Sequence, residues 1–131
     1  MIQRFLVNNS GCGNDTASER KMMRKYIVDS VTYWAKNYNV DGFRFDLMGL
    51  IDTETMKEVR AALDEIDPSI IILGEGWDMN TTMDEGEMTI QPNAYQVASD
   101  GTNNGIAFFN DSVRDGLKGS VFSDTDTGFV S

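Results

Sequence analysis

The stretch VDGFRFDLMG, at residues 40–49, places two opposite charges inside an apolar run. Successive side chains of a β-strand alternate between its faces, so Arg44 and Asp46 share one face and the aromatic residues beside them point to the other. Burying a charge is costly unless the charge is paired. The two residues therefore form either a structural salt bridge or part of a functional site.

A third charged residue, Glu75, follows an unbroken apolar run in IIILGEGWD. Functional residues of α/β folds gather at the C-terminal ends of strands, where both Asp46 and Glu75 stand. Adjacent strands lie ~4.8 Å apart, so the two carboxyls could approach ~5–5.5 Å, the separation used in retaining glycoside hydrolysis. Glycines on both sides of Glu75 leave room for a ligand, and Trp77 offers a flat apolar surface that suits a sugar ring.

Purely structural interpretations of the same residues stay open at this point. Arg44 and Asp46 could form a salt bridge with no chemical role, and Glu75 could be a solvated strand end. Their positions at the ends of consecutive strands favour a site. The GCGN stretch at 11–14 has no strand before it and lacks the third glycine of a dinucleotide-binding loop. Met23 and Trp34 belong to an apolar stripe that we interpret as core.

Composition narrows the chemistry further. The 131 residues carry a net charge of −10, which argues against nucleic-acid or anionic-membrane partners. Cys12 is the single cysteine and histidine is absent, so histidine-based triads, histidine-ligated zinc and cysteine clusters are excluded from this sequence. Chemistry must therefore run mainly on carboxylates. No cofactor, metal site or protein partner is indicated. Calcium would be compatible with the sequence, but no ligand cluster specifies it.

Hydrophobic periodicity predicts the elements that must position these residues. Residues 1–15 are typical of a loop, and Thr16 with Glu19 has the spacing of a capping box. A polar excursion is expected over 78–104. The expected helices and strands, in chain order, are a helix at 17–37, a strand at 40–47, a helix from Asp52 or Thr53 to Ile66, a strand at 70–73, a strand at 106–109 and a helix at 111–120.

This order predicts an α/β fold with a parallel sheet. The first two strands start roughly 30 residues apart, the length of a βαβ unit. An unbroken run such as Ile70–Leu73 suits a strand that is covered on both faces. The pattern alone does not separate a doubly wound sheet from a (β/α)8 barrel. No segment approaches the ~20 apolar residues of a membrane span, and no convincing signal peptide precedes the first helix, so the compartment stays unassigned.

Four segments together resemble type I pullulanases, starch-debranching members of the α-amylase superfamily. They are GNDTASER, DGFRFDLMG, GEGWD and FNDSVRDGLKGSVF. The resemblance covers nearly the whole chain and implies a partial (β/α)8 barrel, about strands 4 to 6 with their helices. Residues 1–131 would then be one interior fragment of a single catalytic domain that cleaves α-1,6 branch linkages of α-glucans with retention.

By position, the resemblance implies that Asp46 is the nucleophile and Glu75 the general acid/base. Arg44 matches the arginine that holds the nucleophile, and Trp77 lies where an aromatic residue would contact substrate. The family's third acid and two histidines have no match here, and its YNWGYDP motif is absent. A complete barrel takes ~250 residues, so the chain alone is expected to be inactive.

Three alternatives stay open. The chain could derive from an enzyme with isoamylase-like or α-1,4 specificity. It could also be a non-catalytic carbohydrate-binding remnant, because the third acid is missing. An unrelated doubly wound binding protein would need Arg44 and Asp46 to be purely structural.

Overall fold

The computed structural model describes residues 7–79, 83–99, 101 and 105–130. The expected loop at 1–15 and the expected excursion at 78–104 lie partly outside these residues. Within the described part the element order is α1 (Lys21–Tyr38), β1 (Gly42–Phe45), η1 (Met48–Leu50), α2 (Thr53–Asp64), β2 (Ile71–Gly74), η2 (Glu85–Glu87), η3 (Gln91–Gln96), β3 (Ala107–Phe108) and α3 (Asp111–Lys118), where η marks a 3-10 helix.

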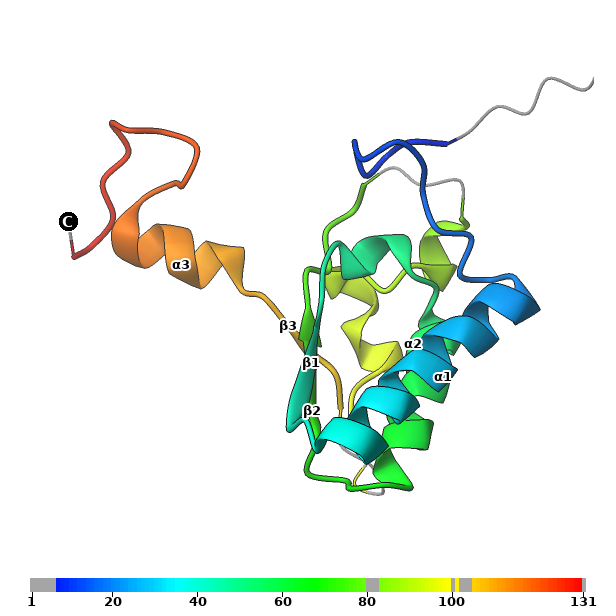
Figure 1. The fold of residues 1–131 in the computed structure, drawn as a ribbon. Coiled ribbons are helices and arrows are strands. Elements are labelled where there is room, and N and C mark those ends of the chain that lie inside the picture. Colours follow the sequence, from blue (N-terminus) through cyan, green and yellow to red (C-terminus); the bar gives the residue numbers. More distant parts are fainter. Residues whose placement is uncertain (1–6, 80–82, 100, 102–104, 131) are drawn as a thin grey trace, which may run out of the picture.

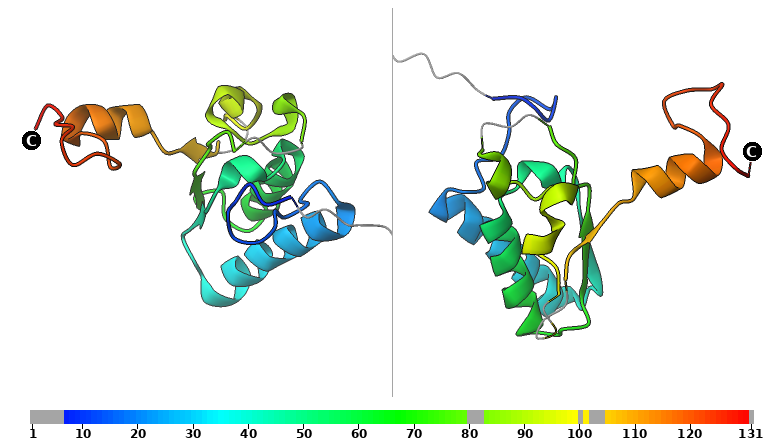
Figure 2. Two further views of the ribbon diagram at one scale, coloured as in Figure 1. Left: turned by 90° about the horizontal axis from the view of Figure 1, so that it is seen from above. Right: turned by 180° about the vertical axis from the view of Figure 1, so that it is seen from behind.

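The three strands form one parallel sheet in the order β1-β2-β3, as the sequence predicted. Phe45 pairs with Gly74, and Gly74 pairs with Phe108, so the strands end together at one edge. Helices α1 and α2 lie side by side against one face of this sheet (Figure 1). α3 and the segment after it stand away from the rest of the molecule in all three views (Figure 2).

The core lies between the sheet and the two helices. Its fully buried members come from η1, α2 and β2 and are no more than 1% exposed; they are Met48, Met56, Val59, Leu63 and Ile72. Phe43 and Phe45 pack against this core, whereas Arg44, between them on β1, points to the other face. The alternation that the sequence predicted for this strand is therefore present.

The expected start of the first helix was wrong. Thr16 and Glu19 do not form a capping box, because α1 begins after Arg20 and has no side-chain cap. The reason is a tertiary contact: Ser18 is fully buried, and its hydroxyl accepts a hydrogen bond of 2.9 Å from the amide of Asp52. A hydrogen bond to another element thus outcompetes the local cap.

The expected burial of the α1 stripe was also partly wrong. The helix buries Val31 and Ala35, while Trp34 is 49% exposed. Trp34 instead stacks on Tyr38 with ring centroids 4.6 Å apart, in an aromatic cluster on the helix surface. Val31 is buried as the stripe predicts, but near the end of the helix Ala35 is buried in place of Trp34.

Among the described residues, only one face of the sheet is covered. Ile71 is 59% exposed and Ile72 is 1% exposed, so the expectation that the Ile70–Leu73 strand is covered on both faces does not hold here. The outer edges of β1 and β3 have no strand partner among the described residues. Both features are those of a sheet that other elements would complete. None of the helices described is long and apolar enough to cross a membrane.

We expect that the 131-residue chain, made alone, does not behave as a stable monomer. Its two open strand edges and bare apolar face are sites for intermolecular pairing. Size-exclusion chromatography with near-UV circular dichroism should show self-association and no sharp melting. Ile71→Lys should reduce the association, because Ile71 lies on the bare face. A monodisperse monomer with a cooperative melting transition would contradict this prediction.

Candidate active site at the strand ends

The two predicted carboxylates stand next to each other at the C-terminal edge of the sheet. Asp46 directly follows β1, and Glu75 directly follows β2. The last residues of these strands, Phe45 and Gly74, are register partners, and the amide of Glu75 donates to the carbonyl of Phe45 at 3.2 Å. The parallel register therefore brings together two acids that lie almost thirty positions apart in the sequence.

Arg44 binds both acids with one guanidinium group. Its Nη1 donates to Asp46 Oδ1, and its Nη2 donates to Glu75 Oε1 at 2.5 Å. A planar guanidinium holds two carboxylates in a fixed arrangement that an ammonium group cannot match. Since both carboxylates contact this single group, they lie well inside the ~9.5 Å upper limit for paired carboxyls of glycosidases.

The two carboxylates differ in exposure. The side chain of Glu75 is 11% exposed, whereas that of Asp46 is 73% exposed. Glu75 is also held by the backbone, because the amide of Leu47 donates to its Oε2 at 3.0 Å. One acid is thus anchored on both oxygens and the other is open to solvent, so the two can take different chemical roles.

Leu47 is a site residue that sequence reasoning missed. It has a left-handed backbone, with φ 45° and ψ 46°, which is uncommon for a residue other than glycine. This conformation turns the chain sharply after Asp46 and directs the Leu47 amide to Glu75. No residue type in the sequence signals the turn.

Phe109 is a second residue that the sequence did not single out. It follows β3, and its amide donates to the carbonyl of Gly74 at 3.1 Å. Its ring lies 5.5 Å from the Cζ atom of Arg44, within range of a cation–π interaction. The third strand therefore supports the guanidinium that joins the two acids.

Trp77 lies beside the site, and its indole nitrogen donates to Asp111, the first residue of α3. Asp111 also forms an ion pair of 2.8 Å with Arg114. The indole has a single donor, so this bond orients the ring and leaves its faces for apolar contact. Asp111 is a third residue that the sequence did not identify.

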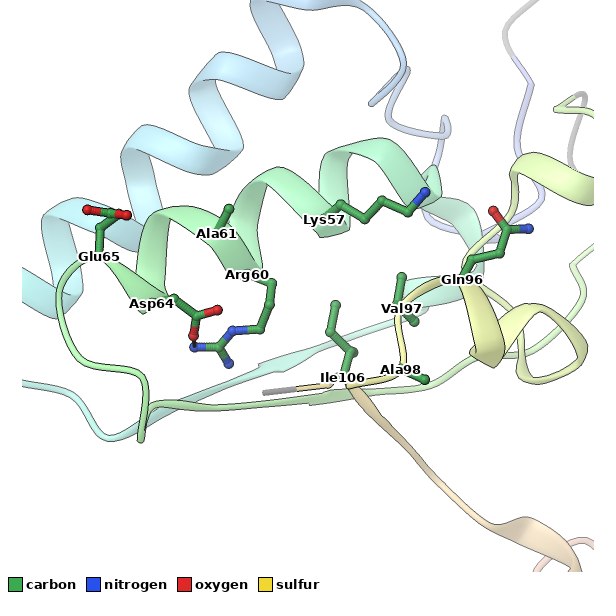
Figure 3. A pocket seen from close by; sticks show the side chains of 9 residues that line it. All are labelled: Lys57, Arg60, Ala61, Asp64, Glu65, Gln96, Val97, Ala98 and Ile106. Atoms are coloured by element: carbon green, nitrogen blue, oxygen red, sulfur yellow. Dashed lines mark ion pairs between the residues drawn. The ribbon is translucent and has the colours of Figure 1, made fainter. Parts of the chain in front are cut away.

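Several pockets lie in the described part of the molecule, and one of them is lined by Asp46. A groove of about 530 Å³ reaches Asp46 from the side of α1 and is lined there by Thr16, Tyr26 and Ile51. A second pocket of about 260 Å³ lies between α2 and residues 96–98 (Figure 3). It holds the Arg60–Asp64 ion pair of 2.6 Å and contains none of the predicted site residues.

Among the residues that the structure describes, no group of three or more Asp, Glu, Cys or His side chains could hold a metal ion.

A buried polar cluster fixes the start of α2, which follows the Asp46 loop. Asp52 caps the helix by accepting from the Thr55 amide at 2.9 Å, from the Thr55 hydroxyl at 2.6 Å and from Arg24 at 2.8 Å. Burial alone raises the pKa of Asp52, but hydrogen bonds with Thr55 and Ser18 and the charge of Arg24 together lower that pKa below its ordinary value. The cluster thus prefers an ionised Asp52.

Comparison with known proteins relates this chain to one family. No family model matches the sequence. A curated protein from Bacillus subtilis (strain 168), named pullulanase, is 44% identical over 123 residues, which are 94% of this chain and 16% of that protein. A crystal structure of pullulanase from Anoxybacillus sp. LM18-11, complexed with maltotetraose, is 52% identical with a TM-score of 0.88 and covers 98% of this chain and 18% of that one.

By sequence and by fold, this chain belongs with the pullulanases. A pullulanase structure from Paenibacillus barengoltzii, in complex with maltohexaose and α-cyclodextrin, agrees, with 46% identity and a TM-score of 0.89 over 98% of this chain. The resemblance stated from the four motifs is thereby confirmed. The chain spans less than a fifth of the length of each of these three pullulanases.

A pullulanase chimera offers a folded context in which to test the Asp52 cluster. In it, this chain replaces the matching segment of the Bacillus subtilis pullulanase. At pH 7, Asp52→Asn should lower the free energy of unfolding by roughly 1–3 kcal/mol, because partly buried donors lose a charged acceptor. Thermal melts of the chimera and its variant measure this difference.

The sign of the pH dependence follows from the lowered pKa of Asp52. A carboxyl whose pKa is lower in the folded state stabilises the fold above its unfolded pKa, about 3.9. That stabilisation disappears as the pH falls through the folded value, so the gap between the chimera and the variant should close below about pH 4. Asp84→Asn is the matched control, since Asp84 is exposed and makes no side-chain cap bond. A gap independent of pH would contradict the assignment.

Proposed function

We propose that this chain is part of the catalytic (β/α)8 barrel of an α-glucan debranching enzyme, contributing about strands 4 to 6. The enzyme would hydrolyse α-1,6-glucosidic branch linkages in pullulan- or amylopectin-like glucans by a retaining double displacement. The observation that carries the proposal is the Arg44 guanidinium, which holds Asp46 and Glu75 together at the ends of adjacent parallel strands.

In the first step, a carboxylate oxygen of Asp46 attacks the anomeric carbon and forms a glycosyl ester. The bond from that carbon to the glycosidic oxygen breaks, and Glu75 gives its proton to this oxygen as the leaving alcohol departs. In the second step, water attacks the same carbon while the Glu75 carboxylate takes a proton from the water. The ester bond breaks, Asp46 is regenerated as a carboxylate, and the sugar leaves with its original configuration.

The exposures of the two acids fit these roles. Asp46 is open to solvent, as a nucleophile that must contact a sugar carbon needs to be. Glu75 is nearly buried and anchored, which suits a group that must hold its position while it first donates and then accepts a proton.

Arg44 links the two steps electrostatically. Before the reaction its positive charge is shared between the two acids. When Asp46 becomes a neutral ester, the attraction of the guanidinium is directed to Glu75 alone. Its hydrogen bond to Glu75 then holds that side chain in place while it acts as the base.

The substrate class is supported by the related structures. The pullulanase of Anoxybacillus was solved with maltotetraose. The pullulanase of Paenibacillus barengoltzii was solved with maltohexaose and α-cyclodextrin. We infer that this chain takes part in binding the same class of α-glucan and that the face of the Trp77 ring contacts a sugar. The third catalytic acid would come from a part of the enzyme that this chain does not contain.

We predict that two substitutions in the pullulanase chimera stop hydrolysis by different routes. Asp46→Asn removes the nucleophile, so release of reducing sugar from pullulan should fall almost to zero. Glu75→Gln removes the proton donor, worth ~10²–10⁴-fold in rate, but leaves the nucleophile. A maltosyl fluoride, whose fluoride leaves with little need for a proton, should therefore still glycosylate Asp46 in this variant, and mass spectrometry should find the trapped sugar there.

Asp41→Asn is the matched control, because Asp41 is an exposed carboxylate just before the opposite end of β1. Near-normal turnover in Asp46→Asn, or a sugar trapped on another residue, would overturn the roles proposed here. A folded chimera that cleaves linear α-1,4 glucans better than pullulan would favour an α-1,4 specificity. A folded chimera that binds glucans without cleaving them would favour the non-catalytic remnant, and the isolated chain should cleave neither polymer.

A further inference from the structure

Gly49 occupies a position where a side chain has no room. It lies buried within η1, and a Cβ atom there would overlap the carbonyl oxygen of Trp77 and lie 2.9 Å from its carbonyl carbon. The Cγ2 atom of Ile90 would be 3.2 Å away. Two of these three atoms belong to the backbone, which cannot swing aside as the end of a flexible side chain can. The requirement for glycine here comes from close approach, not from a left-handed backbone.

The close approach joins the two loops that carry the acids. Gly49 belongs to the turn that follows Asp46, and Trp77 belongs to the segment that begins with Glu75. The amide of Gly49 donates to the carbonyl oxygen of Glu75 at 3.0 Å. The amide of Leu47, two residues earlier, donates to the carboxylate of Glu75 at 3.0 Å. The same turn therefore holds both the backbone and the side chain of Glu75.

We propose that Gly49 is a positioning residue for Glu75: by letting the turn after Asp46 lie in contact with residues 75–77, it sets where the acid/base carboxyl stands relative to the nucleophile. This inference rests on the proposed function. Gly49 itself has no side chain to touch substrate, and it acts through its own amide, which binds the Glu75 carbonyl, and through the turn whose Leu47 amide binds the Glu75 carboxylate.

The proposal makes a specific claim about Gly49→Ala. A methyl group would push residues 75–77 away from the turn by something on the order of 1 Å, and a misplacement of that size can cost ~10²-fold in rate. The loss should fall on the step that needs the Glu75 proton. Asp46 precedes the turn at the end of β1, so its attack should be affected much less.

The test compares two substrates in the pullulanase chimera under single-turnover conditions. Pullulan has a sugar leaving group that must be protonated, whereas maltosyl fluoride does not need strong protonation. Gly49→Ala should slow pullulan cleavage about 10²-fold and slow the burst of fluoride release by less than about 10-fold. Gly86→Ala is the matched control, because a Cβ at Gly86 meets nothing within 4 Å and no positive φ requires glycine there. It should leave both rates unchanged.

A second variant keeps the inference testable if Gly49→Ala fails to fold. Leu47→Gly retains the close approach and accepts the left-handed backbone, but it loosens the turn whose amide holds Glu75. It should slow pullulan cleavage by about 3- to 10-fold, the usual worth of one hydrogen bond, and spare fluoride release.

The outcomes separate this inference from the proposed function. If Glu75→Gln is inactive on pullulan but the folded Gly49 and Leu47 variants slow both substrates equally, or neither, then the positioning role is wrong and the proposed function stands. If Glu75→Gln cleaves pullulan normally, the proposed function fails and the inference fails with it. A selective loss on pullulan in either variant, together with an inactive Glu75→Gln, supports both.

Discussion

The geometry of the strand ends depends on the two ion pairs that the guanidinium of Arg44 forms with Asp46 and Glu75. Two carboxylates side by side repel each other, and a single positive charge between them removes that repulsion. The guanidinium is held in its turn by the alternation of β1, which directs it away from the core, and by the ring of Phe109 below it. Each of the three strands thus supplies one part of the arrangement: β1 carries Arg44 and Asp46, β2 leads to Glu75, and β3 leads to Phe109.

A buried cluster around Asp52 supports the turn that follows Asp46 at this edge of the sheet. Asp52 ties the start of α2 to α1 through Arg24 and to the preceding loop through Ser18. The turn after Asp46 is therefore fixed at both ends, by β1 on one side and by a capped helix on the other. Within it, Leu47 adopts a conformation that a free chain rarely visits. Such local strain persists only where the surroundings determine it, as they do here.

Much of this site could be predicted from sequence, for a physical reason. A strand has a period of two, so the Arg44-to-Asp46 spacing places both side chains on one face whatever the rest of the fold is. Glu75 could be added because parallel strands end at the same edge. The motifs around these residues also led to the correct family. The parallel sheet, its three strands and the last helix were expected as well, with boundaries that differ by a few residues.

Other features could not be predicted, because they depend on contacts between distant segments. The spacing of Thr16 and Glu19 indicated a helix cap. Ser18, between them, instead accepts a hydrogen bond from the Asp52 amide, and α1 begins only after Arg20. Trp34 has the right spacing for a core residue, yet its neighbour Ala35 is buried in its place. Phe109 and Asp111 gain their roles only when β3 reaches the sheet and α3 begins. Local patterns carry no information about such partners.

Strand pattern and contacts between distant segments together explain how a segment with an uncovered sheet face can still define a paired acid site. The direct contacts described here between the segments of Asp46 and Glu75 lie between residues 42 and 109: the register of three short strands, one shared guanidinium and one turn without room for a side chain. The guanidinium lies on the face on which Ile71 is exposed, because Arg44 shares the face of Gly42, the register partner of Ile71. Contacts among the described residues therefore set the relative placement of the two acids, whereas one face and two edges of the sheet stay uncovered among these residues. Stability and site geometry are separable here, because hydrophobic burial is non-directional and additive in area, while hydrogen bonds and steric contacts act between particular atoms.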